Sequence, residues 1–302
     1  ELLREAGEPF DREKFLAGRQ TPVFVGSALT NFGVEPFLEG FLALAPPPGP
    51  RPALSGDVPP ARPDFSGVVF KMQANLDPRH RDRVVFVRVC TGRFRRDMEV
   101  TIARSGERFR VRRSVRLFGQ DRETVDDAFP GDVIGIVTSA PLRLGDTICE
   151  AEPVRYTGRW SFPPERFAVV RCDDTGRRKQ FAKGIEQLGQ EGVVQILSDP
   201  SRSTLEPVRA AVGELQFDVV RFRLESEYGT KTVVSPLPFQ TAHWLDGPAA
   251  ALASPNLRSD VKLVHDRDGR PVLLAETTWA LRMIREQNPE LTFDPNPPSG
   301  DA

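Results

Sequence analysis

The sequence predicts a mixed fold, in which an antiparallel β-barrel is followed by an α/β domain of the ferredoxin-like type and preceded by a short α/β remnant. Residues 64–158 contain short β-rich runs separated by glycine, and no convincing helix. Residues 159–246 alternate strand and helix patterns in the order βαββαβ. Residues 1–45 hold a single helix–strand–helix unit, which is typical of an α/β domain.

The N-terminal unit cannot form a sheet by itself. Residues 1–16 and Asn31 to Leu44 have helical patterns, and Thr21 to Val25 is a short β-rich run between them. The apolar residues of the second helix share one face: Phe37, Leu38, Phe41 and Leu42. Because one strand needs a neighbour, we expect the rest of this domain to be absent from the chain. The proline-dense residues 46–63 then predict a stiff linker.

The barrel is predicted over residues 64–158. Its strand-like runs are Ser66 to Gln73, Arg83 to Val89, Glu99 to Ala103 and Asp132 to Val137. Short strands at this spacing indicate a small antiparallel barrel.

The α/β domain is predicted over residues 159–286. Its strands are Arg166 to Cys172, Gly192 to Leu197, Pro207 to Val212, Lys231 to Ser235 and Thr241 to Leu245. Helices are expected over Arg177 to Gln190 and Glu214 to Tyr228, with a cap from Asp173, Asp174 or Thr175 and with Gly229 ending the second. Beyond Gly247 we expect a hairpin of Val261 to Val264 with Val272 to Glu276, a helix over Trp279 to Glu286, and a disordered tail over 287–302.

Composition excludes several classes of protein. Cys90, Cys149 and Cys172 form no close pair, and the three histidines lack metal-ligand spacing, so neither a disulfide framework nor a metal site is expected. No apolar run is long enough to span a bilayer, and the N-terminus lacks a signal-peptide pattern. These features favour a cytoplasmic protein with reduced thiols, and we expect a monomer.

Charge is concentrated in the predicted barrel. Residues 79–116 contain thirteen Arg and no Lys against four acidic residues, whereas residues 117–153 contain eight acidic residues and two Arg. Arginine suits bidentate contacts to phosphate, so the basic block suggests a surface that lies on an RNA backbone. A solvated face partly neutralised by the acidic block is the alternative. The candidate contact residues are Lys71, Arg79, His80, Arg81, Arg83, Arg93, Arg95 and Arg96.

Three motifs resemble one family of proteins. Residues 26–34, Gly-Ser-Ala-Leu-Thr-Asn-Phe-Gly-Val, resemble the last guanine-nucleotide motif of the translational GTPases. Residues 70–83, from Phe70-Lys71-Met72 to Arg83, resemble the second-domain signature of the bacterial peptide chain release factor 3 family, and residues 213–220 and 224–228 resemble its third domain. The motifs occur in the family's order between about Pro22 and Trp244.

The resemblance implies a function in translation termination. Members of the family are GTPases that bind the ribosome after peptide release and remove class I release factors. The resemblance also implies that the barrel and the α/β domain face rRNA and a ribosomal protein of the small subunit.

The sequence lacks most of the nucleotide-binding motifs of the family that it resembles. It has no phosphate-binding loop with Lys and Ser/Thr, no Asp-x-x-Gly switch before Gly26 and no Asn-Lys-x-Asp base-reading motif. Only the guanine loop Ser27, Ala28 and Leu29 remains, so residues 1–45 resemble the end of a GTPase domain. We therefore expect no catalytic residue, no metal, and no binding of the GTP, GDP and Mg²⁺ that the complete family uses.

Two alternatives remain open from the residues. The chain could hold the docking domains of an elongation factor G-like or tetracycline-protection GTPase, which resemble it in the barrel. It could also be a stand-alone RNA- or protein-binding module, although the isolated strand near Gly26 argues against this.

Overall fold

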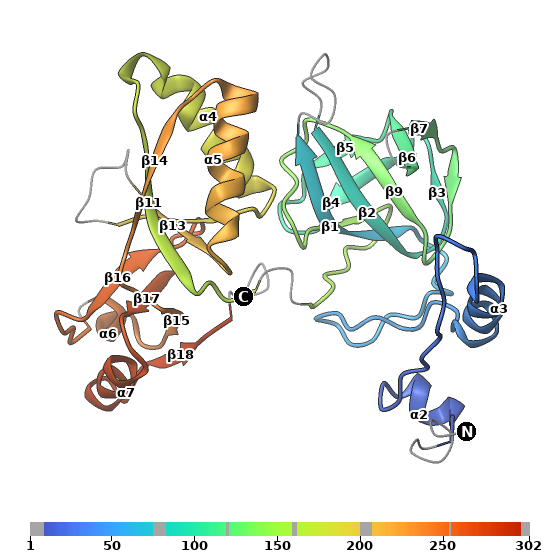
Figure 1. The fold of residues 1–302 in the computed structure, drawn as a ribbon, viewed down its shortest axis with the longest axis horizontal. Coiled ribbons are helices and arrows are strands. Elements are labelled where there is room, and N and C mark those ends of the chain that lie inside the picture. Colours follow the sequence, from blue (N-terminus) through green and yellow to red (C-terminus); the bar gives the residue numbers. More distant parts are fainter. Residues whose placement is uncertain are drawn as a thin grey trace. The chain divides into compact units, whose positions relative to one another are not determined.

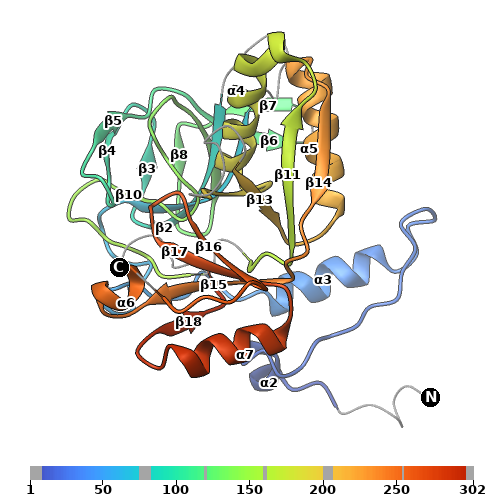
Figure 2. The ribbon, with the colours of Figure 1, turned by 90° about the vertical axis from the view of Figure 1, so that its left-hand side faces the viewer.

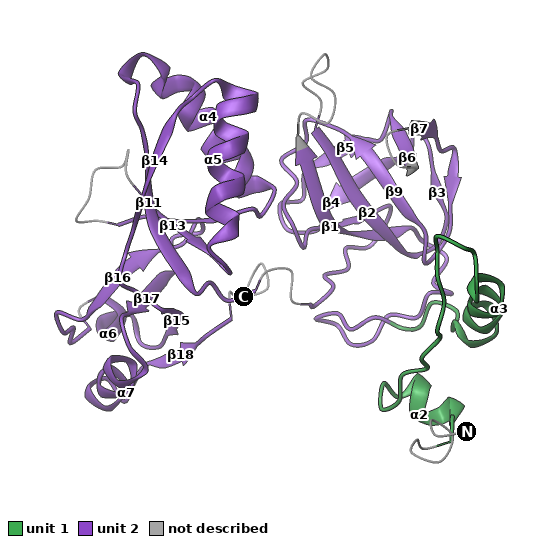
Figure 3. Ribbon diagram, in the orientation of Figure 1, with its two compact units in different colours: residues 1–50 green, residues 51–302 purple. Residues whose placement is uncertain are grey.

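The computed structural model describes residues 9–74, 83–118, 121–158, 162–199, 207–253 and 255–296 (Figure 1). The chain divides into two compact units, residues 1–50 and residues 51–302 (Figure 3), and each is described by itself.

The first unit contains two helices and no strand among its described residues. Helix α2 (Arg12–Leu16) begins at Asp11, whose Oδ1 accepts hydrogen bonds from the backbone N–H of Glu13 at 2.8 Å and of Lys14 at 3.1 Å. Helix α3 (Val34–Leu44) agrees with the second predicted helix. The strand predicted at residues 21–25 is wrong: this segment pairs with no neighbour, and a strand exists only where a second strand satisfies its backbone groups.

The apolar residues of the first unit are exposed. Val23 is 86% exposed and Leu29 is 96% exposed, and on α3 Phe41 and Leu42 are 57% and 76% exposed. No described residue before Val58 belongs to the buried hydrophobic core. The helix and the turn before it therefore present an apolar face that no part of this unit covers.

The second unit begins with an antiparallel sheet of eight strands. Their order is β5-β4-β10-β1-β2-β9-β6-β7. The bounds are β1 (Ser66–Ala74), β2 (Arg83–Thr91), β4 (Glu99–Ile102), β5 (Arg108–Arg110), β6 (Ser114–Phe118), β7 (Asp121–Thr124), β9 (Val133–Val137) and β10 (Thr147–Cys149). Two short strands, β3 (Phe94–Arg95) and β8 (Asp127–Ala128), pair with each other. The sheet curves around its own core (Figure 1), which confirms the predicted barrel architecture.

Alternation along the strands builds the barrel core. Val85, Val87 and Val89 of β2 are fully buried, whereas Arg88 between them is exposed. Phe65 and Phe94 meet in the interior with their ring centroids 5.6 Å apart. This period of two is what places apolar residues inside and arginines outside on the same strand.

Part of the predicted linker packs on the barrel. Arg51 and Val58 form a bridge, and Ala53 pairs with Tyr156. Val58 is buried beside Cys90, Cys149 and Tyr156. Residues 51–58 of the predicted stiff linker thus pack on the sheet, because burying Val58 and making these backbone hydrogen bonds stabilises them there.

The next four strands form the predicted ferredoxin-like sheet. Its order is β12-β13-β11-β14, antiparallel throughout, which is the arrangement expected for βαββαβ connectivity. The bounds are β11 (Arg166–Cys172), α4 (Arg178–Gln190), β12 (Gln195–Leu197), β13 (Val208–Ala211), α5 (Leu215–Tyr228) and β14 (Thr232–Pro236), with a 3₁₀ turn, η1 (Thr175–Arg177), before α4. Helices α4 and α5 lie side by side on one face of this sheet (Figures 1 and 2).

Local sequence signals explain these two helices. Asp174 caps η1 through a 2.8 Å bond from the Gly176 N–H, and Gly229 ends α5 with a φ of 63°. Phe181, Ile185 and Leu188 of α4 are buried against the sheet, as their spacing predicts. Both predicted helices are confirmed.

A second sheet follows, with the order β16-β17-β15-β18. Its elements are β15 (Thr241–Asp246), α6 (Ala249–Ala253), β16 (Val261–His265), β17 (Pro271–Ala275), α7 (Thr278–Gln287) and β18 (Thr292–Asp294). The predicted hairpin and terminal helix are confirmed as β16–β17 and α7. The disordered tail is wrong for residues 292–294, because β18 pairs with β15 along Trp244, Leu245 and Asp246.

The three cysteines are free thiols, with Cys90 and Cys149 buried and Cys172 half-buried. Among the helices of the described ranges, none is both long and apolar enough to cross a membrane. Within the same ranges, no three His, Cys, Asp or Glu side chains come together as a metal site.

Candidate nucleic-acid interface

The basic and acidic blocks of the barrel fold against each other. Arg93 lies 2.9 Å from Asp127, Arg95 lies 3.2 Å from Glu150, and Arg96 lies 3.0 Å from Asp126. The side chains in these pairs are largely open to solvent. Pairs of this kind contribute about 0–1 kcal/mol each, so the arginines can exchange these partners for others at small cost.

Two candidate cations lie over aromatic rings. Lys71 Nζ is 5.3 Å from the centroid of Phe86, and the Arg93 guanidinium is 5.6 Å from the centroid of Phe129. Lys71 is exposed on β1, and Phe129 is 54% exposed. These contacts hold the charged groups at the barrel surface.

Arg83 has a different environment from the other candidates. It is half-buried, and it donates hydrogen bonds to the carbonyl of Ala140 and, at 3.1 Å, to Gln190 Oε1 at the end of α4. Burial, together with the nearby charge of Arg267, lowers the pKa of Arg83. The hydrogen bonds of Arg83 therefore connect the barrel to helix α4 of the ferredoxin-like domain. Arg79, His80 and Arg81 lie outside the described residues.

The guanine-like loop forms a tight turn before α3. Ser27 N–H donates a 2.9 Å hydrogen bond to the carbonyl of Phe32, and Ala28 and Leu29 lie in the turn between them. Gly33 has a φ of 72°, and a Cβ at this position would lie 2.5 Å from the carbonyl oxygen of Val25. Only glycine suits this close approach. The shape of this loop is thus determined by its own backbone hydrogen bond and by Gly33.

A basic groove on the barrel was missed by reasoning from the sequence. Its volume is about 450 Å³, and it is lined by Glu107, Phe109, Arg110, Arg112, Arg113, Val137, Thr138, Ser139 and Ala140. The arginines belong to the basic block, but the block alone does not tell which of its members meet in space. The signal that could have found part of the groove is the close spacing of Arg110, Arg112 and Arg113 along the chain.

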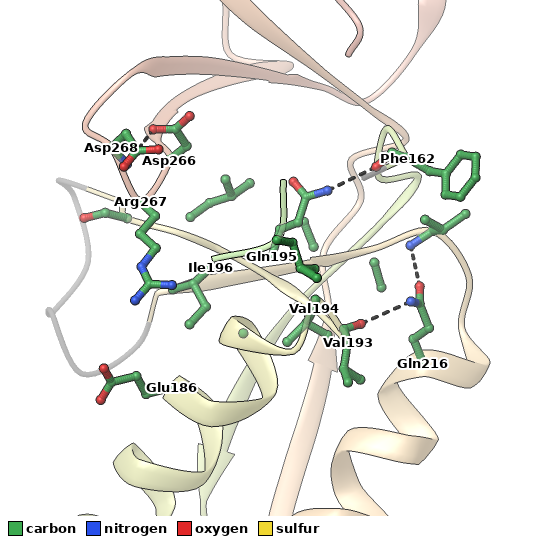
Figure 4. Close-up of a pocket in the computed structure, with 18 of the residues that line it drawn as sticks. Phe162, Glu186, Val193, Val194, Gln195, Ile196, Gln216, Asp266, Arg267 and Asp268 are labelled. Atoms are coloured by element: carbon green, nitrogen blue, oxygen red, sulfur yellow. Dashed lines mark hydrogen bonds between the residues drawn. The ribbon is translucent and has the colours of Figure 1, made fainter. Parts of the chain in front are cut away.

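A larger and more apolar pocket lies beside β12 (Figure 4). Its volume is about 580 Å³, and its lining includes Phe162, Val194, Ile196, Trp244 and Arg267. Its amides have structural partners. Gln195 donates to the carbonyl of Phe162 at 3.1 Å, and Gln216 donates to the carbonyl of Val193 at 3.1 Å. No nucleophile and base are paired among the lining residues, so the pocket indicates no reaction.

Two family models match the chain in succession. The model of elongation factor G domain 2 matches residues 64–151, and the model of the class II release factor RF3 C-terminal domain matches residues 156–285. Peptide chain release factor 3 of Gloeobacter violaceus is 47% identical over 294 residues, which cover 97% of this chain and 55% of that protein. This chain is therefore similar to peptide chain release factor 3 proteins over nearly its whole length. Peptide chain release factor 3 of Synechococcus elongatus is 50% identical over 291 residues, covering 96% of this chain and 52% of that protein.

The chain spans about half the length of these curated relatives. A crystal structure of a protein from Thermus thermophilus shares the fold, with a TM-score of 0.58 over 84% of this chain and 38% of that chain. Its identity to this chain is 19%, so it supports the architecture alone. The match to the peptide chain release factor 3 family and this shared architecture agree with the fold class that the sequence predicts.

Proposed function

We propose that this chain provides the ribosome-docking domains of a release factor 3 GTPase, which acts in translation termination by removing class I release factors after peptide release. The observation that carries this proposal is the identity of 47–50% to release factor 3 proteins over 96–97% of the chain, with both domain models in order. In this view the chain works as a cytoplasmic monomer and meets class I release factors only through the ribosome.

The barrel surface supports an RNA partner. Lys71, Arg93, Arg95 and Arg96 are exposed, and the three arginines are held by surface ion pairs that cost little to exchange. Phosphate contacts of such residues release counterions from the RNA, which favours binding at low salt. We propose these residues, together with Arg79, His80 and Arg81, as contacts to small-subunit rRNA or to a ribosomal protein beside it.

Binding of the chain to ribosomes tests the proposal. We expect the chain to sediment with small ribosomal subunits at about 50 mM salt and to dissociate steeply toward about 200 mM. An affinity that does not change with salt concentration would instead indicate that protein contacts dominate the interaction. No sedimentation at low salt would contradict the proposed function.

The match to elongation factor G domain 2 supports a second candidate, a docking fragment of an elongation factor G-like GTPase. The release factor 3 C-terminal model over residues 156–285 favours the first candidate.

We propose that residues 1–302 by themselves do not bind GTP or GDP. In the family that this chain resembles, the backbone of the loop at residues 27–29 contacts the guanine edge, and one such contact is worth about 1 kcal/mol. Measurable affinity needs several times this free energy. Isothermal titration of the chain with GTP or GDP in the presence of Mg²⁺ is therefore expected to show no binding heat. A micromolar Kd would contradict this expectation and would give the turn a nucleotide-binding role.

A further inference from the structure

We propose that the basic groove of the barrel, lined by Arg110, Arg112, Thr138 and Ser139, is a binding site for the phosphodiester backbone of RNA. This inference rests on the proposed ribosome-docking function and gives it a location that differs from the surface around Arg93, Arg95 and Arg96.

The edge of the barrel sheet places the arginines. β5 is an edge strand, paired on one side only, with β4 (Figure 2). Phe109 packs against the barrel core, so Arg108 and Arg110 extend from the opposite face of the strand. Arg112 follows in a tight turn after β5, in which its N–H donates to the carbonyl of Arg110 at 3.1 Å. The turn keeps Arg110 and Arg112 close together at the end of β5.

In the part of the chain that the structure describes, two arginines of this edge, Arg110 and Arg112, lack the acidic partners that several other surface arginines have. Within the described ranges, neither Arg110 nor Arg112 forms an ion pair with any carboxylate, in contrast to Arg93, Arg95 and Arg96. Glu99, which pairs with Arg110 in the β4–β5 ladder, lies 3.8 Å from Arg108 instead. Both residues are exposed, so their guanidinium donors are open to a ligand.

The floor of the groove adds uncharged donors. It is formed by the end of β9 and the residues after it, where the Val137 N–H donates to the carbonyl of Arg113 at 3.0 Å. Thr138 Oγ1 accepts from the Ala140 N–H at 3.1 Å, which orients this turn. Ser139 is exposed, and neither its N–H nor its hydroxyl has a partner among the described residues. A phosphate here would meet guanidinium groups on one side and hydroxyl and amide donors on the other.

The composition of the groove favours RNA over an acidic protein. A protein interface has an apolar, tightly packed core with aromatic anchors. Phe109 is half-buried against the barrel interior. The exposed residues of the lining are three arginines, one serine and one acid: Arg110, Arg112, Arg113, Ser139 and Glu107. Repeated arginines without an apolar anchor are typical of backbone contacts, which give affinity without reading sequence.

A double charge reversal tests the site. R110E/R112E should weaken binding to small ribosomal subunits by about 10- to 100-fold at low salt, because two charge-assisted contacts become repulsive. It should also reduce the slope of log affinity against log salt by about 1.4–1.8, which corresponds to two phosphate contacts. R88E/R282E is the matched control, since it makes the same charge change at two exposed arginines away from the groove. All four residues are exposed, so Tm should be unchanged in both variants.

The outcomes separate the site from the proposed function. If unmodified chain binds subunits and R110E/R112E binds as well as R88E/R282E, the groove is not the site and the docking function stands. If the chain does not bind subunits at low salt, the docking function itself fails. Protein-free small-subunit rRNA is the second probe: loss of binding to it by R110E/R112E supports RNA recognition. Loss of subunit binding with unchanged rRNA binding would assign the groove to an acidic protein and overturn the proposal.

Discussion

Replacing Trp244 by alanine is expected to lower the free energy of unfolding by about 3–5 kcal/mol, the range for removing a large aromatic residue from a core. Trp244 is 4% exposed. It lies in a hydrophobic cluster that contains Phe167 and Val208 of the ferredoxin-like sheet and Val264 and Val272 of the second sheet. The indole thus joins the two sheets, and its loss leaves a cavity where they meet. Urea unfolding followed by circular dichroism measures the change.

A Trp244→Phe variant separates packing from hydrogen bonding. It keeps an aromatic ring but loses the 3.0 Å bond from the indole N–H to Asp266 Oδ2. Asp266 retains bonds from the N–H groups of Asp268 and Arg270, both at 2.9 Å, so this variant should lose about 1 kcal/mol plus a small packing term. If Trp244→Ala lowered the free energy of unfolding by less than Trp244→Phe does, the result would contradict a hydrophobic core shared by the two sheets.

Stability is expected to fall by about 3 kcal/mol as the pH drops from 6.5 to 4, because of one buried histidine. His243 on β15 is 7% exposed, and no described group bonds its Nδ1. Burial first, and then the nearby charge of Arg285, lower the pKa of His243, and with the opposing effect of Asp294 the pKa is about 4. Between the two pKa values the unfolded chain binds a proton that the folded chain does not, so protons favour unfolding there.

A His243→Leu variant removes this dependence while keeping an apolar group in the site. Chemical unfolding of both proteins across pH 4–7 should give stabilities that diverge above pH 4 and run parallel above about 6.5. Carboxylates titrate in the same range in both proteins, so only the difference between the curves reports on His243. Parallel curves over the whole range would show that folding leaves the pKa of His243 unchanged, which would contradict this account.

Local sequence patterns were sufficient to predict the elements whose stabilising residues lie within the element itself. The spacing of Phe181, Ile185 and Leu188 predicts α4, and Gly229 marks the end of α5, because both depend on neighbours within a few residues. The strand at residues 21–25 failed for the opposite reason, since its β-rich composition needs a partner strand. Likewise β18 is held by its pairing with β15, and nothing in its own composition indicates that pairing.

The candidate interface shows the same limit. The basic block shows which segment of the sequence carries the positive charge. How many of its arginines are left without an acidic partner depends on where the acidic residues lie in the fold. Asp126, Asp127 and Glu150 lie far along the chain from the arginines that they contact. The groove at Arg110 and Arg112 combines the chain between β5 and β6 with the end of β9. These segments meet because β6 pairs with β9, which the sequence of either segment does not indicate.

Sedimentation of the chain with small ribosomal subunits as a function of salt tests the central claim most directly. The account predicts binding at about 50 mM salt, with log affinity falling linearly in log salt and a slope that reports several phosphate contacts. Absence of binding at this salt concentration, with a chain that circular dichroism shows to be folded, would contradict the claim that these domains dock on the ribosome.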